Sequence, residues 1–106
     1  MSFHLSAENI EIIDNHLLVA RLRDEGGEFR DASIDLNHFL GNDNGRFQWD
    51  GTGFSNSADG VSFHIEGGGE VPVLRARLQT ADGEWADADV NLSERVENIN
   101  GCFEFR

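Results

Sequence analysis

The 106-residue sequence predicts an all-β protein with short helical turns, built from two copies of one unit. The copies are visible as a repeat, because residues 20–49 align with residues 76–105 without a gap and 12 of these 30 positions are identical. Strands are indicated by alternating residues in LLVARLR and VLRARL, which follow the period of two of a half-buried strand. An Asn-Gly pair in each copy indicates a tight hairpin turn. A chain of this length has room for one domain.

The repeat continues upstream with a shorter offset. The pattern F-x-x-S-A-x-x-(I/V) begins at Phe3 and again at Phe54, an offset of 51 residues instead of 56. The sequence repeats are therefore residues 1–50 and 51–106, and the second copy carries five extra residues. The glycine-rich stretch EGGGE at 66–70 accounts for them most naturally and is typical of a flexible hairpin loop.

Each copy predicts the same order of elements. The strand LLVARLR or VLRARL is followed by a glycine turn and by a return strand, GEFRDASI or GEWADADV. Asp35 and Asn91 then precede short apolar runs, which is the signature of the N-cap of a short helical turn. The Asn-Gly pairs at 44–45 and 100–101 predict type I′ turns, since both central residues of such a turn need a positive φ.

The strand after each Asn-Gly pair carries two aromatic residues on one face. Phe47 and Trp49 alternate with polar residues in the first copy, and Phe103 and Phe105 take the same positions in the second. We expect both pairs to point inward and to anchor a core. This interpretation leaves the first Asn of each N-x-N-G motif without a role.

Composition excludes several classes of function. Eight basic and twenty acidic residues give a formal charge of −12, which repels nucleic acid and anionic membrane surfaces. The sequence has no apolar run long enough to insert into a membrane and no signal-peptide pattern at its start, so we expect a cytoplasmic or non-classically released protein. Cys102 is the only cysteine, which rules out an internal disulfide. The four histidines lack metal-ligand spacing, so no metal and no cofactor are expected.

The pairing of SIDLNHFLGNDNGRFQW with DVNLSERVENINGCFEF in a duplicated chain resembles the cyanovirin-N homologues, a family of mannose-binding lectins. The resemblance runs from Phe3 to Phe105. It implies a pseudo-symmetric fold in which each half has a triple-stranded sheet plus a β-hairpin, and in which the hairpins are exchanged between the repeats. The structural halves would then be residues 1–40 plus 96–106, and residues 41–95.

The resemblance also implies a shallow sugar pocket in each half, for α1,2-linked mannose of high-mannose-type glycans. The pocket of the discontinuous half would consist of Ser2, Leu5, Ser6, Arg23, Asp24, Glu25, Asn98, Ile99 and Asn100. The pocket of the central half would consist of Asn42, Asp43, Asn44, Thr52, Gly53, Phe54, Ser57, Gln79, Thr80 and Ala81. Such residues suit vicinal hydroxyl groups, which both donate and accept hydrogen bonds. At about 1 kcal/mol per hydrogen bond, a shallow pocket binds weakly, roughly in the millimolar range.

Other pairs are expected across the strands. The disulfides of a well-studied family member map onto Ala7 with Leu22 and onto Ala58 with Leu78, so apolar pairs would fill that space here. The repeated arginine and aspartate positions predict cross-strand ion pairs. These pairs are Arg21 with Asp31 and Arg77 with Asp87.

Three functions remain open at this stage. The first is a lectin with one or both pockets active. Its partners would be mannose-containing oligosaccharides or glycoproteins. The family often has Asp where Asn44 and Asn100 stand, and this difference weakens charge-assisted hydrogen bonds. A non-catalytic interaction or structural module with decayed pockets is therefore the alternative, and a glycan-cleaving enzyme is a distant third. We expect a monomer, with a domain-swapped dimer through the hinge WDGTGF at 49–54 as the other outcome.

Overall fold

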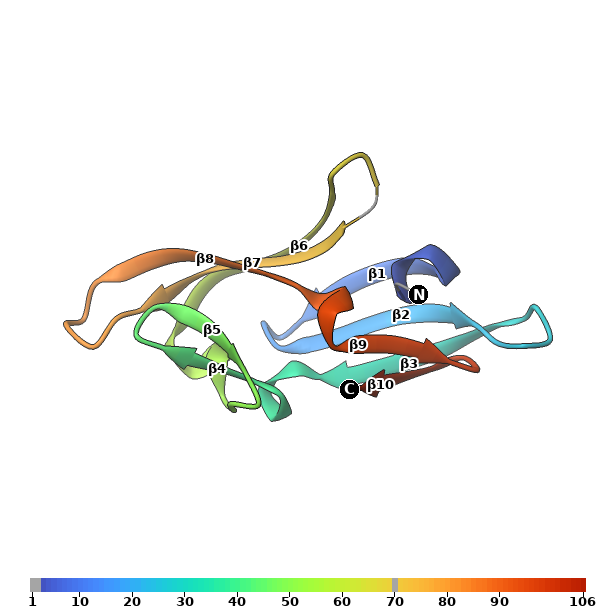
Figure 1. Cartoon of the computed structure of the whole chain (residues 1–106), viewed down its shortest axis with the longest axis horizontal. Helices are drawn as coiled ribbons and strands as arrows, with labels where there is room; N and C mark the ends of the chain where they lie inside the picture. Colours follow the sequence, from blue (N-terminus) through green and yellow to red (C-terminus); the bar gives the residue numbers. More distant parts are fainter. Residues whose placement is uncertain (1–2, 70) are drawn as a thin grey trace.

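The computed structural model describes residues 3–69 and 71–106 and has an antiparallel all-β fold with short 3₁₀ turns, as predicted (Figure 1). The elements in chain order are η1 (Phe3–Ser6), β1 (Ala7–Ile13), β2 (Leu17–Arg23), β3 (Phe29–Asp35), η2 (Leu36–His38), β4 (Leu40–Asp43), β5 (Arg46–Trp49), η3 (Phe54–Ser57), β6 (Ala58–Glu66), β7 (Val71–Gln79), β8 (Trp85–Asn91), η4 (Leu92–Glu94), β9 (Val96–Ile99) and β10 (Cys102–Phe105). Each repeat supplies one three-stranded sheet, β1-β2-β3 or β6-β7-β8, and one hairpin, β4-β5 or β9-β10. None of the helical segments in the described ranges is long and apolar enough to cross a membrane.

Local sequence signals explain where the elements begin and turn. Asp35 caps η2 by accepting a hydrogen bond from the Asn37 amide, and Asn91 caps η4 in the same way. In the hairpin turns, Asn44 and Asn100 have φ values of 49° and 50° and are followed by glycines with φ above 80°. The predicted caps and turns are therefore confirmed. The glycine-rich stretch also lies where predicted, at the end of the β6–β7 hairpin, where Glu66 pairs with Val71.

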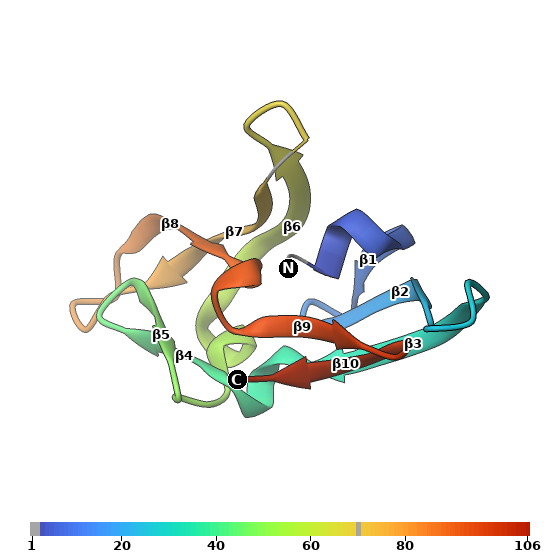
Figure 2. The ribbon, with the colours of Figure 1, turned by 45° about the vertical axis from the view of Figure 1, so that its right-hand side comes forward.

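The two hairpins are exchanged between the repeats. Strand β10 packs beside β3 and β9 contacts η1, whereas β5 packs beside β8 and β4 contacts η3. Both views show the β9-β10 hairpin alongside β3, although these segments lie at opposite ends of the chain (Figures 1 and 2). The sheet of each repeat is therefore completed by the hairpin of the other, as the family resemblance implies.

One core joins both repeats. Its fully buried side chains come from the first copy, including Phe3 and Leu36, and from the second, including Phe54 and Leu92. The expected inward aromatic residues pack across the exchange. The Phe47 ring meets Phe54 at 5.5 Å between ring centroids, and the equivalent Phe103 meets Phe3 at 5.4 Å.

The predicted cross-strand pairs are found with one difference. Ala7 lies opposite Leu22, and the equivalent pair of the second copy is also in register, so apolar pairs take these positions. Arg21 lies opposite Asp31, with 3.8 Å between Nε and Oδ1. Arg77 lies opposite Asp87 as expected, but its ion pair is with a different acid.

The partner of Arg77 is Asp59, which faces it from the other neighbouring strand at 2.6 Å. Arg77 sits on the central strand between two carboxylates, and its guanidinium turns toward β6 instead of β8. Sequence spacing within one hairpin could not distinguish these two partners.

Candidate functional site

Two hollows are each lined by the Asn-Gly turn of a hairpin and by the turn of a sheet from the other repeat. The two pairs of turns lie at opposite ends of the molecule (Figure 1). We call the two hollows the Asn42 pocket, of about 420 Å³, and the Asn98 pocket, of about 330 Å³. The Asn42 pocket is lined by Asn42, Asp43, Asn44, Ser57, Gln79, Thr80 and Ala81. The Asn98 pocket is lined by Ser6, Arg23, Asp24, Glu25, Asn98, Ile99 and Asn100.

The structure brings together most residues that the family resemblance assigned to the Asn42 pocket. Thr52, Gly53 and Phe54 are the assigned residues that do not line it. The Phe54 side chain is completely buried in the core. Gly53 precedes η3, and its amide donates to the carbonyl of Asn37, away from the hairpin turn.

The Asn98 pocket likewise contains most of its predicted residues. Ser2 lies outside the described residues. Leu5 is 61% exposed and lines a different hollow, together with Phe63 and Ile65 of the long β6-β7 hairpin. Segments 23–25 and 98–100 lie side by side as expected, although they are far apart in the sequence.

Asn42 ties three segments of the chain together. Its Nδ2 donates to the Ser57 hydroxyl and to the Gln79 carbonyl, both at 2.8 Å. Its Oδ1 accepts a hydrogen bond from the Gly45 amide, also at 2.8 Å. Both amide protons and the carbonyl of Asn42 are thus used within the protein. The side chain closes the hairpin turn and holds the hairpin against the second repeat.

Asn98 makes the same three hydrogen bonds in the other half. Its Nδ2 donates to the Ser6 hydroxyl at 2.8 Å and to the Arg23 carbonyl at 3.0 Å. Its Oδ1 accepts from the Gly101 amide at 2.9 Å. The first Asn of each N-x-N-G motif, which the sequence left without a role, therefore positions the pocket walls. The appearance of the same Asn in both copies is the signal that sequence reasoning could have used.

The second Asn of each motif makes a further link. Asn44 Oδ1 accepts from the amide of Ala81 at 2.9 Å, and Asn100 Oδ1 accepts from the amide of Glu25 at 3.0 Å. Both side chains are otherwise exposed, and their amide groups retain hydrogen-bonding capacity for a ligand.

The Asn98 pocket is lined by more charged residues than the Asn42 pocket. Asp24 is a lining residue of the Asn98 pocket, and its side chain is only 7% exposed. Its Oδ2 accepts a hydrogen bond from Arg30 Nε at 2.6 Å, while Oδ1 accepts from the amides of Gly26 and Glu28. The Arg30 hydrogen bond, helped by the backbone amide of Glu28, holds the pKa of Asp24 below its usual value. Asp24 thus fixes the turn that forms one wall of the pocket.

This lowered pKa predicts an acid-sensitive contribution to stability. The contribution of ionised Asp24 is fully present above the unfolded-state pKa of about 3.9 and is lost as the pH falls through the lower folded-state pKa. We expect the difference in unfolding free energy between wild type and Asp24→Asn, measured by urea denaturation, to narrow as the pH falls from 5 toward 2. Arg30→Gln should raise the pKa of Asp24 in a carboxyl NMR titration. An unchanged pKa in that variant would contradict the assigned cause.

The residues that line both pockets can form hydrogen bonds with a bound ligand. Each combines side-chain amides, carboxylates, hydroxyl groups and turn backbone in an open hollow. Within residues 3–69 and 71–106, no three metal-ligating side chains cluster together. A ligand rich in hydroxyl groups could both donate to and accept from such a lining.

Comparison with known proteins gives consistent matches along the whole chain. The CVNH domain family model matches residues 3–104. A cyanovirin-N homolog from Neurospora crassa is 52% identical, over 98% of this chain and 97% of that protein. The NMR structure of a Gibberella zeae CVNH protein superposes with a TM-score of 0.89 at 43% identity, covering 97% of this chain and 95% of that one. A designed cyanovirin-N homolog lectin gives a TM-score of 0.93 at 39% identity, with both chains fully covered.

Two more distant structures contain sugars. A variant of MoCVNH3 in complex with (N-GlcNAc)4 has a TM-score of 0.83 at 25% identity, over 98% of this chain and 96% of that one. A microvirin–mannobiose complex has a TM-score of 0.87 at 23% identity, over 99% and 98% of the two chains, and shows the shared fold.

Proposed function

The chain belongs to the cyanovirin-N homologue family, and from this premise we propose that it is a lectin for α1,2-linked mannose of high-mannose-type glycans. This is a family of lectins and not of enzymes, so the expected activity is binding without turnover. The partners would be mannose-containing oligosaccharides or glycoproteins, held at the Asn42 pocket, the Asn98 pocket or both.

The observation that carries the proposal is the repeated construction of the pockets. In both halves an N-x-N-G turn lies beside the turn of a sheet from the other repeat, held there by the same asparagine hydrogen bonds. The arrangement leaves exposed amide, carboxylate and backbone groups around each hollow. These groups can pair with two neighbouring hydroxyls of one sugar ring.

Affinity for a single disaccharide should be low. Each hydrogen bond contributes about 1 kcal/mol net, and an open pocket allows few of them. Two pockets at opposite ends of one molecule can engage two branches of a clustered glycan, and this raises avidity without any new contact.

A two-dimensional amide NMR titration of the full chain with α1,2-mannobiose tests the proposal. We expect shifts in residues 42–44 with 79–81, in residues 98–100 with 23–25, or in both sets, at sugar concentrations that reach the millimolar range. Residues 52–54 were also assigned to this pocket but do not line the hollow, and shifts of their amides would show that they respond to the sugar as well. Maltose, a glucose disaccharide of the same size, is the matched control and should leave these amides unmoved.

Two other outcomes would overturn the mannose proposal. If no amide moves with mannobiose, the pockets are decayed and the interaction-module alternative is supported. If the same amides respond to (N-GlcNAc)4 and not to mannobiose, the pockets bind sugar but the specificity is that of the MoCVNH3 complex.

A further inference from the structure

The N-x-N-G turns contain the two groups that react when an asparagine loses its side-chain amide. In this deamidation the main-chain nitrogen of the next residue attacks the asparagine Cγ, and glycine hinders the attack least because it has no side chain. The sequence contains two Asn-Gly pairs, Asn44-Gly45 and Asn100-Gly101. Each pair forms the turn of an exchanged hairpin, and each of the two asparagines lines a pocket.

The asparagine of each pair is accessible, whereas the attacking nitrogen is not. Asn44 and Asn100 are exposed, but Gly45 and Gly101 are buried. The backbone of Gly45 is packed so closely against the second repeat that a methyl group on it would lie 3.0 Å from Thr80 Cγ2. Solvent therefore reaches the side-chain amide of each pair far better than it reaches the nitrogen that must lose its proton.

The first asparagine of each motif holds this nitrogen. The Gly45 amide donates to Asn42 Oδ1 at 2.8 Å, and the Gly101 amide donates to Asn98 Oδ1 at 2.9 Å. A buried, hydrogen-bonded amide gives up its proton only when the local structure opens. The nitrogen attacks only after that proton is lost, so the same opening must precede deamidation.

The side chain under attack is restrained as well. Asn44 Oδ1 accepts a hydrogen bond from the Ala81 amide at 2.9 Å, and Asn100 Oδ1 accepts one from the Glu25 amide at 3.0 Å. These bonds tie each side-chain amide to a turn of the other repeat. Hydrogen bonds thus restrain both reacting groups of each pair.

We propose that Asn44 and Asn100 are deamidation sites which the folded turns keep unreactive, and that Asn42 and Asn98 are the residues that protect them. The protection is local, because each protecting asparagine holds the glycine three residues later in its own hairpin. Each turn should therefore become reactive when its own protecting residue is removed. This protection does not depend on the lectin function proposed above.

Water is the only co-reactant that the modification needs. Once the glycine nitrogen has lost its proton, it forms a bond to the asparagine Cγ, the Cγ–Nδ2 bond breaks and ammonia leaves. Water then opens the succinimide ring at Cγ, which gives aspartate, or at the main-chain carbonyl carbon, which gives isoaspartate. Each conversion adds one negative charge to a chain of formal charge −12. Isoaspartate also lengthens the main chain within the turn that borders a pocket.

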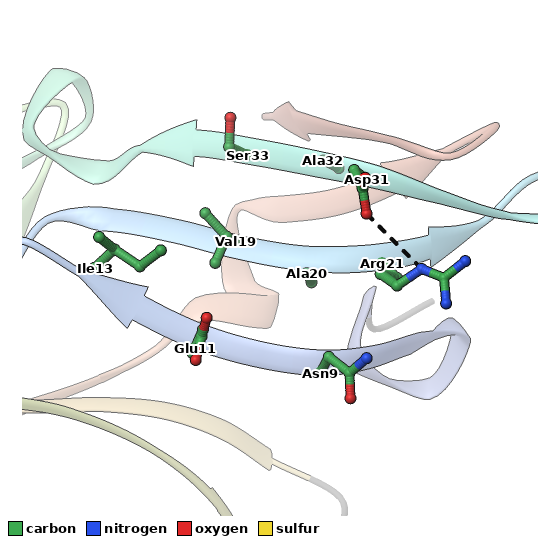
Figure 3. A pocket seen from close by; sticks show the side chains of 9 residues that line it. All are labelled: Asn9, Glu11, Ile13, Val19, Ala20, Arg21, Asp31, Ala32 and Ser33. Carbon is green, nitrogen blue, oxygen red and sulfur yellow. Dashed lines mark ion pairs between the residues drawn. The ribbon is translucent and has the colours of Figure 1, made fainter.

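Asn9 provides a comparison within the same molecule. It is exposed on the outward face of the β1-β2-β3 sheet (Figure 3), and its φ of 56° is close to the 49° of Asn44. The residue after it is Ile10, whose branched side chain hinders attack by the main-chain nitrogen. We therefore expect Asn9 to stay intact under conditions that modify the turns.

The experiment follows deamidation of the full chain in mildly alkaline buffer by peptide mass spectrometry. Folded wild type should react slowly at both turns, and wild type unfolded in urea should react rapidly at both. Asn42→Ala should react about tenfold faster than wild type at Asn44, because it removes the bond to the Gly45 amide and two further bonds that hold the turn. Asn100 should keep its wild-type rate in that variant, and Asn98→Ala should give the reverse pattern.

Ser57→Ala is the matched control. It removes one partner of Asn42 but leaves the hydrogen bond between Asn42 and the Gly45 amide in place, so Asn44 should stay protected. A second measurement needs no variant. At urea concentrations below the unfolding transition, deamidation of Asn44 in wild type should rise in parallel with hydrogen exchange of the Gly45 amide.

Several results would overturn the proposal. An unfolded chain that deamidates no faster than the folded one would show that the turns protect nothing. An unchanged rate at Asn44 in Asn42→Ala, or equal acceleration there in Ser57→Ala, would show that the bond to the Gly45 amide is not what protects. Equal acceleration of both turns in Asn42→Ala, together with deamidation in wild type that does not follow exchange of the Gly45 amide, would show that the protection is global and not local.

Discussion

Asn42→Ala is expected to lower the free energy of unfolding by about 3 kcal/mol, because it removes three hydrogen bonds worth about 1 kcal/mol each. Urea denaturation followed by tryptophan fluorescence measures the change. Asp43→Ala is the matched control, since Asp43 is the exposed neighbour on the same strand, and a change within about 0.5 kcal/mol is expected there. Equal losses in the two variants would contradict the clamp assigned to Asn42.

The same variant should separate the two pockets. Without the Asn42 side chain, the hairpin turn is no longer held to the Gln79 carbonyl or the Ser57 hydroxyl. We therefore expect sugar-induced shifts to be lost at the Asn42 pocket and kept at the Asn98 pocket. Asn98→Ala should give the reverse pattern, and a loss at both ends in either variant would indicate global unfolding instead.

Phe54→Ala is expected to cost about 3–5 kcal/mol of stability, in the range of large-to-small substitutions at buried aromatic residues. The Phe54 ring is completely buried and packs edge-to-face on Phe47 from the exchanged hairpin. The same denaturation experiment applies, with Thr52→Ala, an exposed position two residues away, as the control.

A second variant, Phe54→Leu, tests whether the Phe54 ring takes part in sugar binding. Phe54→Leu keeps most of the buried area, so it should lose clearly less stability than the alanine variant and should retain any sugar response. A stable Phe54→Leu protein that no longer binds mannobiose would show that the ring acts in the pocket, as the family resemblance implied.

Local signals were sufficient for most of the secondary structure. The caps at Asp35 and Asn91 and the Asn-Gly turns depend on residues within a few positions of each other, so the sequence alone predicted them. The exchange of hairpins involves contacts between distant segments, and it could be expected only through the family resemblance.

The pocket was harder to predict in detail. Two of the three hydrogen-bond partners of Asn42, Ser57 and Gln79, are 15 and 37 residues away in the other repeat, and no local pattern reveals them. The segment 52–54 was assigned by position within the family, but its place depends on the loop between β5 and η3, which no local sequence pattern fixes. The choice of Asp59 by Arg77 likewise depends on three-dimensional neighbours on both sides of β7.

The hairpin exchange has a consequence for the order in which the molecule is completed on the ribosome. The β1-β2-β3 sheet, which begins at Ala7, is synthesised before the hairpin that covers it, which ends at Phe105. Its clamp joins Ser6 to Asn98, a separation of 92 residues. The β1-β2-β3 sheet can therefore be covered only after residue 105 has emerged, and contacts between residues so far apart in the sequence also form slowly. The central half, whose hairpin precedes its sheet, is complete once β8 ends at Asn91, before the half that starts first.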